Sequence, residues 1–104
     1  MGDKLPRITT QTLTVLSAFK SSGRELSGAE IAKESKLQSG TLYPLLLRLE
    51  QASWLESRWE AATASELGRP RRRLYRLTGD GEKIAVRELS AMAKTIGGLA
   101  WQPS

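Results

Sequence analysis

The chain has 104 residues, which suits one domain that buries about two-thirds of the surface of its unfolded chain. It has no cysteine and no histidine, so disulfides, thiolate metal sites and the usual general base are excluded. The net charge is +5, and six arginines against two glutamates between positions 58 and 76 supply +4 of it. This local excess of positive charge predicts a docking surface for DNA, RNA or an anionic membrane.

Two other classes of protein are disfavoured by the same composition. The apolar stretch from Leu13 to Phe19 is too short and too polar for a signal peptide, and no run reaches the length of a membrane span. We therefore expect a cytoplasmic protein. Peripheral membrane binding is disfavoured as well, because the basic segment is not flanked by an apolar face that could insert into the membrane. The eleven carboxylates form no paired constellation, so we expect no enzyme, no cofactor and no metal.

The first helix is predicted from Thr9 to about Ser22, because Leu13, Leu16 and Phe19 recur at helical spacing. Residues 24–26 then form a short extended connector that can add a third strand to a small sheet. A second, short helix is predicted over residues 28–35. The residues of this second helix that we expect to face inward are Ala29, Ile31 and Ala32.

The start of the second helix carries a capping-box pattern, in which Ser27 and Glu30 each hydrogen-bond to the other's backbone N–H. A third helix is predicted to begin near Gly40 or Thr41, since Pro44 is best tolerated in a first turn. It ends near Ala52. Its apolar face consists of Leu42, Leu45, Leu46 and Leu49. A short helix, a four-residue turn and a longer helix fit a helix-turn-helix.

A β-hairpin is predicted next, with strands at residues 54–60 and 74–77 and an arginine-rich tip at residues 68–73. The trial register has three pairs on one face: Leu55 with Leu77, Ser57 with Tyr75, and Trp59 with Arg73. On the other face it pairs opposite charges: Glu56 with Arg76, and Glu60 with Arg72. The long connection predicts a tip that stays mobile until it meets a partner.

Thr78 is predicted to cap a last helix that runs to about residue 96. A coiled-coil-like spacing defines an apolar seam on this helix: Ala85, Leu89, Met92, Ile96 and Leu99. The seam belongs either to the core or to a contact between subunits. Ile84 and Val86 lie off the seam, and we expect them to pack on the body of the domain.

Two stretches together resemble the PadR family of bacterial transcriptional regulators: SGTLYPLLLRLE at residues 39–50 and GRPRRRLYRLTGDG at residues 68–81. The similarity extends over roughly residues 8–89. It implies a mainly α fold with a small β-hairpin (α+β), a winged helix-turn-helix followed by a C-terminal dimerisation helix. The family usually has glycine where this chain has Ser53, and we expect Ser53 to adopt a left-handed conformation at a cost of about 1 kcal/mol.

The resemblance also implies the function: a homodimeric, usually repressing regulator of the family's short class that binds double-stranded DNA. Residues 1–78 would be the DNA-binding domain and residues 79–104 the dimerisation helix, with the seam residues at the dimer interface. A symmetric dimer predicts an inverted-repeat operator with half-sites about one helical turn apart. The alternative is a winged-helix module for protein–protein contact without effector sensing.

The second helix of a helix-turn-helix enters the major groove, which assigns part of the third helix to DNA: Ser39, Gly40, Thr41, Tyr43, Pro44 and Arg48. Tyr43 is either a DNA contact or a packing residue, and Arg48 either a phosphate contact or a plain surface residue. The predicted hairpin of residues 54–77, which we call the wing, contributes four further candidates: Arg69, Arg71, Arg72 and Arg73. Strand parity turns Arg72 away from two of the others, so we expect two or three of the four to contact DNA.

Ligand sensing depends on the resemblance alone. PadR-like repressors often respond to small aromatic or hydrophobic effectors, and some use aromatic residues near the dimer helices. Trp101 is the candidate effector-binding residue, and its alternative is packing on the neighbouring subunit. Trp54 and Trp59 are expected to be structural.

Overall fold

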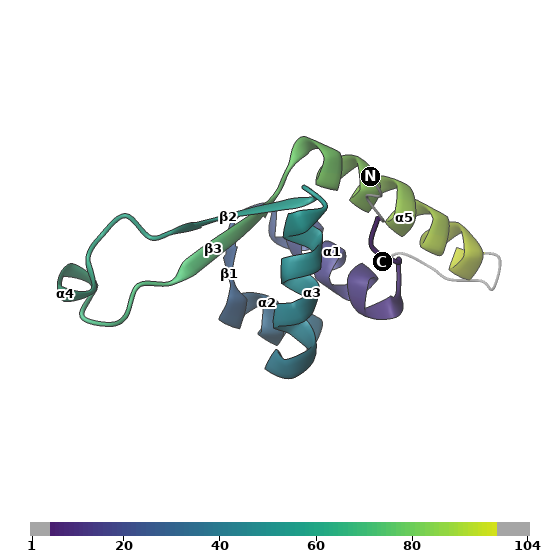
Figure 1. Ribbon diagram of the computed structural model, residues 1–104. Coiled ribbons are helices and arrows are strands. Elements are labelled where there is room, and N and C mark those ends of the chain that lie inside the picture. The colour runs from purple at the N-terminus through teal and green to yellow at the C-terminus, as the bar shows by residue number, and fades with distance from the viewer. Residues whose placement is uncertain (1–4, 98–104) are drawn as a thin grey trace.

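The computed structural model describes residues 5–97, and the side chains of residues 5–95. The order of its elements is α1 (Thr10–Ser22), β1 (Leu26–Ser27), α2 (Gly28–Ser35), α3 (Ser39–Gln51), β2 (Leu55–Trp59), α4 (Ala64–Leu67), β3 (Arg73–Leu77) and α5 (Gly79–Gly97). The strands form an antiparallel sheet in the order β1-β3-β2. In Figure 1, α1, α2 and α3 form one body, the β2–β3 hairpin projects from it with α4 at its tip, and α5 runs toward the opposite side. The fold is a mainly α winged helix with a small sheet, as predicted.

The core lies between α1, α2, α3 and the base of the sheet. The predicted apolar face of α3 is confirmed, since all four of its leucines are buried. In α2, Ile31 is fully buried, but Ala29 is exposed, so the prediction that Ala29 faces inward was wrong. Successive residues of a helix are rotated by about 100°, so Ala29 and Ile31 lie on nearly opposite sides.

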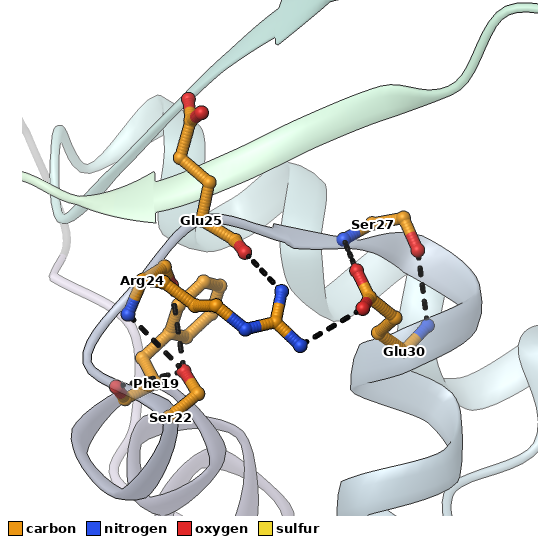
Figure 2. A network of polar contacts seen from close by, with 6 residues as sticks. All are labelled: Phe19, Ser22, Arg24, Glu25, Ser27 and Glu30. Carbon is orange, nitrogen blue, oxygen red and sulfur yellow. Dashed lines mark hydrogen bonds and ion pairs between the residues drawn. The ribbon is translucent and has the colours of Figure 1, made fainter.

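The turn that leads into α2 is held by polar contacts (Figure 2). The predicted capping box is present: Ser27 N–H donates to Glu30 Oε1 at 2.8 Å, and Glu30 N–H donates to Ser27 Oγ at 3.2 Å. Arg24 donates to the other oxygen of Glu30 at 3.0 Å and to the backbone carbonyl of Glu25 at 2.9 Å. These contacts fix the first turn of α2 beside β1, and the predicted third strand forms there.

Helix α3 begins earlier than predicted, at Ser39, which places Pro44 in the second turn. Its start has no side-chain cap, and the N–H groups of Thr41 and Leu42 both donate to the Gln38 carbonyl, at 3.0 and 2.9 Å. The hydrogen bond that Pro44 cannot make would end on the carbonyl of Gly40. Gly40 is exposed, so water can satisfy that carbonyl, and proline is tolerated deeper in the helix than predicted.

The end of α3 confirms the expectation for Ser53, whose φ is 63°. Ser53 N–H donates to the Glu50 carbonyl at 2.9 Å, and Trp54 N–H donates to the Leu49 carbonyl at 3.0 Å. This pair of hydrogen bonds is a Schellman motif, which usually has glycine at the left-handed position. It turns the chain into β2 and buries Trp54.

The hairpin has the predicted register, including all three pairs of the inner face and the ion pair between Glu56 and Arg76. Glu60 also lies opposite Arg72 as predicted, since its backbone N–H donates to the Arg72 carbonyl at 3.0 Å. Their side chains form no ion pair, because the Glu60 carboxylate binds Arg69 and the Arg72 backbone N–H instead. The connection also contains α4, which was not predicted. A Thr63–Glu66 capping box starts α4, so the signal was present in the sequence.

Helix α5 begins as predicted, since Gly81 N–H donates to Thr78 Oγ1 at 3.0 Å. Ile84 packs against the core as expected, but the expectations for Ala85 and Val86 were wrong. Ala85 is fully buried within the chain, so it is not available to a second subunit, and Val86, predicted to pack inward, is 52% exposed. The helix packs on α1 through the face that includes Ala85, and Val86 points about 100° away from it.

The apolar surface left on α5 consists of Val86, Leu89 and Met92, which we call the α5 strip. Leu89 is half-buried and Met92 is 39% exposed. The side chain of Ile96 and the whole of Leu99 lie outside the described residues. Within residues 5–97, no helix is long and apolar enough to span a bilayer.

Gly81→Ala is expected to destabilise the protein by about 3 kcal/mol. Gly81 is buried at the start of α5, and a Cβ there would overlap the Trp54 backbone carbonyl. That carbonyl also accepts the Thr78 N–H at 3.1 Å, so neither segment can yield without breaking a hydrogen bond. Gly79→Ala is the matched control, because a Cβ at Gly79 meets nothing within 4 Å. Urea unfolding compares the two variants, and equal losses of stability would contradict this packing.

Candidate nucleic-acid interface

The α3 residues assigned to DNA from the sequence all lie at the surface. Tyr43 is 45% exposed, and the other five are exposed too: Ser39, Gly40, Thr41, Pro44 and Arg48. The buried leucines occupy the opposite side of the helix. The structure therefore brings these six residues together on the free side of α3 and its first turn.

Tyr43 has two environments at once. Its ring packs against the start of α2, where a Cβ on Gly28 would lie 2.8 Å from Tyr43 Cε1. Its remaining surface borders a cleft of about 190 Å³ between α2, α3 and β3, which Arg72 and Arg73 also line. A side chain at position 28 would therefore displace the tyrosine ring, which also faces the side of the wing.

Four of the six arginines between positions 58 and 76 are neutralised by carboxylates of the same chain. The pairs are Arg58 with Glu25 at 2.7 Å, Arg69 with Glu60 at 2.7 Å, Arg73 with Glu50 at 3.5 Å, and Arg76 with Glu56. Arg71 and Arg72 have no ion pair within the described part of the chain, and both are exposed. Among residues 5–97, these two neighbours are thus the wing arginines that no carboxylate pairs with, a distinction that strand parity could not make.

Glu60 links the two sides of the hairpin at the base of the wing tip. Its carboxylate accepts both terminal nitrogens of Arg69, at 2.7 and 2.9 Å, and the backbone N–H of Arg72 at 2.8 Å. Its backbone carbonyl accepts Arg71 Nε at 2.8 Å. The Arg69 guanidinium, followed by the Arg72 N–H, lowers the pKa of the Glu60 carboxyl to about 2. Sequence reasoning assigned Arg69 to DNA, whereas here its side chain holds the tip in shape.

Arg69→Gln is expected to raise the pKa of Glu60 toward its ordinary value of 4.5, because the largest stabiliser of the carboxylate is removed. In the intact protein the folded-state pKa is depressed, so the contribution of Glu60 is complete above about pH 4.5 and is lost as the pH falls toward 2. Carboxyl NMR titration measures both midpoints.

Glu66 is the internal control for this titration. The Thr63 backbone N–H, not an arginine, lowers the pKa of Glu66 most. Its midpoint should therefore be the same in both proteins. An unchanged Glu60 midpoint in the variant would rule out the pairing with Arg69.

A second group of contacts joins the wing to the end of α3. Ser57 Oγ donates to Glu50 Oε2 at 2.5 Å, and Arg73 Nε donates to Ser57 Oγ at 3.0 Å. The Arg73 guanidinium also lies 5.6 Å from the centroid of the Trp59 ring, a cation–π geometry. Arg73 thus has a structural role in the free protein. Nothing in the sequence pattern singles out Glu50 or Ser57, because the contact depends on how α3 and β2 meet.

A helix-turn-helix beside a basic hairpin of a small antiparallel sheet defines a winged-helix DNA-binding protein. The model of the PadR-like family of transcriptional regulators matches residues 13–87, and the chain belongs to this family. It is therefore a DNA-binding transcriptional regulator, in a family of regulators rather than enzymes. No curated protein matches the chain significantly in sequence.

Solved structures have the same fold. A PadR family transcription regulator from hypervirulent Clostridium difficile R20291 is 23% identical, with a TM-score of 0.71 over 88% of this chain and 94% of that one. The protein smu.1704 from Streptococcus mutans UA159 is 25% identical, with a TM-score of 0.66 over 100% of both chains. BpsR from Bordetella bronchiseptica, whose DNA binding is regulated by 6-hydroxynicotinic acid, is 22% identical, with a TM-score of 0.70 over 88% of this chain and 63% of that one.

Proposed function

We propose that the protein is a homodimeric repressor that binds an inverted-repeat operator through α3 and the wing. The observation that carries this proposal is the combination of an exposed α3 face with two unpaired arginines, Arg71 and Arg72, on the adjoining hairpin of the described chain. In this arrangement α3 enters the major groove, and the wing arginines contact the flanking phosphates or the neighbouring minor groove. The phosphate contacts supply affinity, and α3 supplies sequence preference.

The α5 strip supports the dimer. An apolar strip on a terminal helix that the body of the same chain covers only in part is a surface that a second copy can bury. Two copies related by a twofold axis present two α3 helices, which matches an operator of two inverted half-sites with centres about one helical turn apart.

Release by a small aromatic or hydrophobic effector is a further part of the proposal. The regulation of BpsR by an aromatic acid supports a search of this ligand class, although the likeness to that protein is one of fold. Trp101, the candidate effector residue, lies outside the described residues. Its test is the release of bound DNA by a series of aromatic acids, compared between the intact chain and Trp101→Ala.

Selection of bound fragments from a random pool of duplex DNA, at a stated salt concentration, tests the proposed function. The expected result is an enriched inverted repeat. Recovery of a single asymmetric site would overturn the symmetric dimer, and failure to enrich any sequence would overturn sequence-specific binding altogether. A reporter placed behind the selected operator then distinguishes repression from activation.

A further inference from the structure

The outward face of α3 is largely apolar along its centre. Helical periodicity places Gly40, Pro44, Leu47 and Gln51 opposite the buried leucines. Leu47 is 56% exposed, more than Tyr43 beside it. The polar candidates lie at the edges of this face, with Tyr43 on one side and Thr41 and Arg48 on the other. The first three residues of the central line carry no side-chain hydrogen-bonding group.

This apolar line is continuous with the DNA-binding surface. Tyr43 lies one turn before Leu47 and borders the cleft that Arg72 and Arg73 line, so the line and the wing cations lie toward the same side. Arg48, exposed next to Leu47 in the sequence, adds another positive charge there. A polyanion is therefore the occupant that the surrounding charge favours.

We propose that Leu47, together with Pro44, reads the methyl groups of thymines in the major groove. The proposal rests on the proposed function and names how α3 selects its sequence. Thymine alone of the four bases presents a methyl group in that groove, and an apolar side chain recognises it without a hydrogen bond. Pro44 and Leu47 are separated by about 4.5 Å along the helix axis, close to the roughly 3.4 Å rise of one base step. The two side chains are thus spaced for thymines at neighbouring steps.

The test replaces each thymine of the selected operator, one at a time, by deoxyuridine, which lacks only the methyl group. For the intact protein, we expect one or two positions in each half-site at which the Kd rises by about fourfold, the effect of one buried methyl group. For Leu47→Ala, the same replacement should no longer change the Kd at the position that Leu47 contacts. Leu47 is exposed, so this variant should fold as the intact protein does.

The matched control is Leu5→Ala, which removes another exposed leucine from outside α3 and should keep the full thymine dependence. An intact protein that binds the operator but is indifferent to every deoxyuridine replacement would overturn the inference. So would a Leu47→Ala variant that keeps every penalty of the intact protein. An intact protein that selects no DNA sequence would instead overturn the proposed function, so the two failures are distinct.

Discussion

Replacing Arg71 and Arg72 together by glutamate is expected to weaken operator binding by roughly two to three orders of magnitude at about 100 mM salt. These are the wing arginines without an ion pair in the described part of the chain, and each reversal would turn the proposed attraction to a phosphate into a repulsion. Both side chains are exposed, so the fold should be retained. Fluorescence anisotropy with a labelled operator measures the Kd, and circular dichroism checks the fold.

Two double variants that each remove two positive charges separate the effect of where the charge lies from the effect of how much charge is removed. Arg71→Gln with Arg72→Gln removes two charges from the hairpin, and Arg58→Gln with Arg76→Gln removes two from the same hairpin. The second pair already binds Glu25 and Glu56 in the free protein, so its removal should weaken DNA binding far less. The slope of log K against log salt should become shallower by about 0.9 for each phosphate that the variant no longer neutralises. Equal effects of the two double variants would contradict the assignment of Arg71 and Arg72.

Leu89→Asp with Met92→Asp is expected to convert the protein to monomers and to weaken operator binding by roughly two orders of magnitude or more. The two changes place charges on the α5 strip, where burial against a second copy would desolvate them. A monomer engages one half-site at a time and forgoes the high effective concentration that the linked second site provides. Sedimentation velocity measures the oligomeric state.

The control for this experiment lies on the other side of the same helix. Ala91→Asp with Thr95→Asp adds the same charge at two exposed positions away from the α5 strip, and we expect this variant to remain dimeric. A dimeric Leu89→Asp, Met92→Asp protein would refute the strip as the interface. Loss of the dimer in both variants would show that net charge, not the strip, decides the oligomeric state, and would equally refute the strip.

Much of the hairpin and the helix ends could be predicted from the sequence, because the signals are local. The register follows from the facing charges of Glu56 and Arg76, and the start of α2 follows from Ser27 and Glu30. The left-handed conformation of Ser53 was expected from the resemblance, because the family usually has glycine at this position. The Thr63–Glu66 box was equally local, and α4 was missed because its four residues bury nothing.

The pairing of the wing arginines could not be predicted, because it depends on the path of the connecting loop. Strand alternation separates the two faces of β3, but the partner of Arg69 follows from the turn after α4, which brings Glu60 within 2.7 Å. The burial of residues along α5 is a similar case. Its seam spacing is compatible with two overlapping stripes, and only packing on α1 decides that Ala85 is buried and Val86 is free.

The exposed Leu47 of α3 could be predicted only in part. Periodicity alone places Leu47 opposite the buried face, so the signal was in the sequence. Its significance depends on the exposure of its side chain and on the cleft that joins Tyr43 to the wing, which only the folded arrangement provides.

We propose that the free face of α3 and the tip of the wing contact the same DNA, in a symmetric dimer. Hydroxyl-radical footprinting of the selected operator tests it most directly. We expect protection on both strands that is symmetric about the operator centre, with flanking protection that disappears when Arg71 and Arg72 are replaced by glutamate. An asymmetric footprint, or flanking protection that survives this replacement, would contradict it.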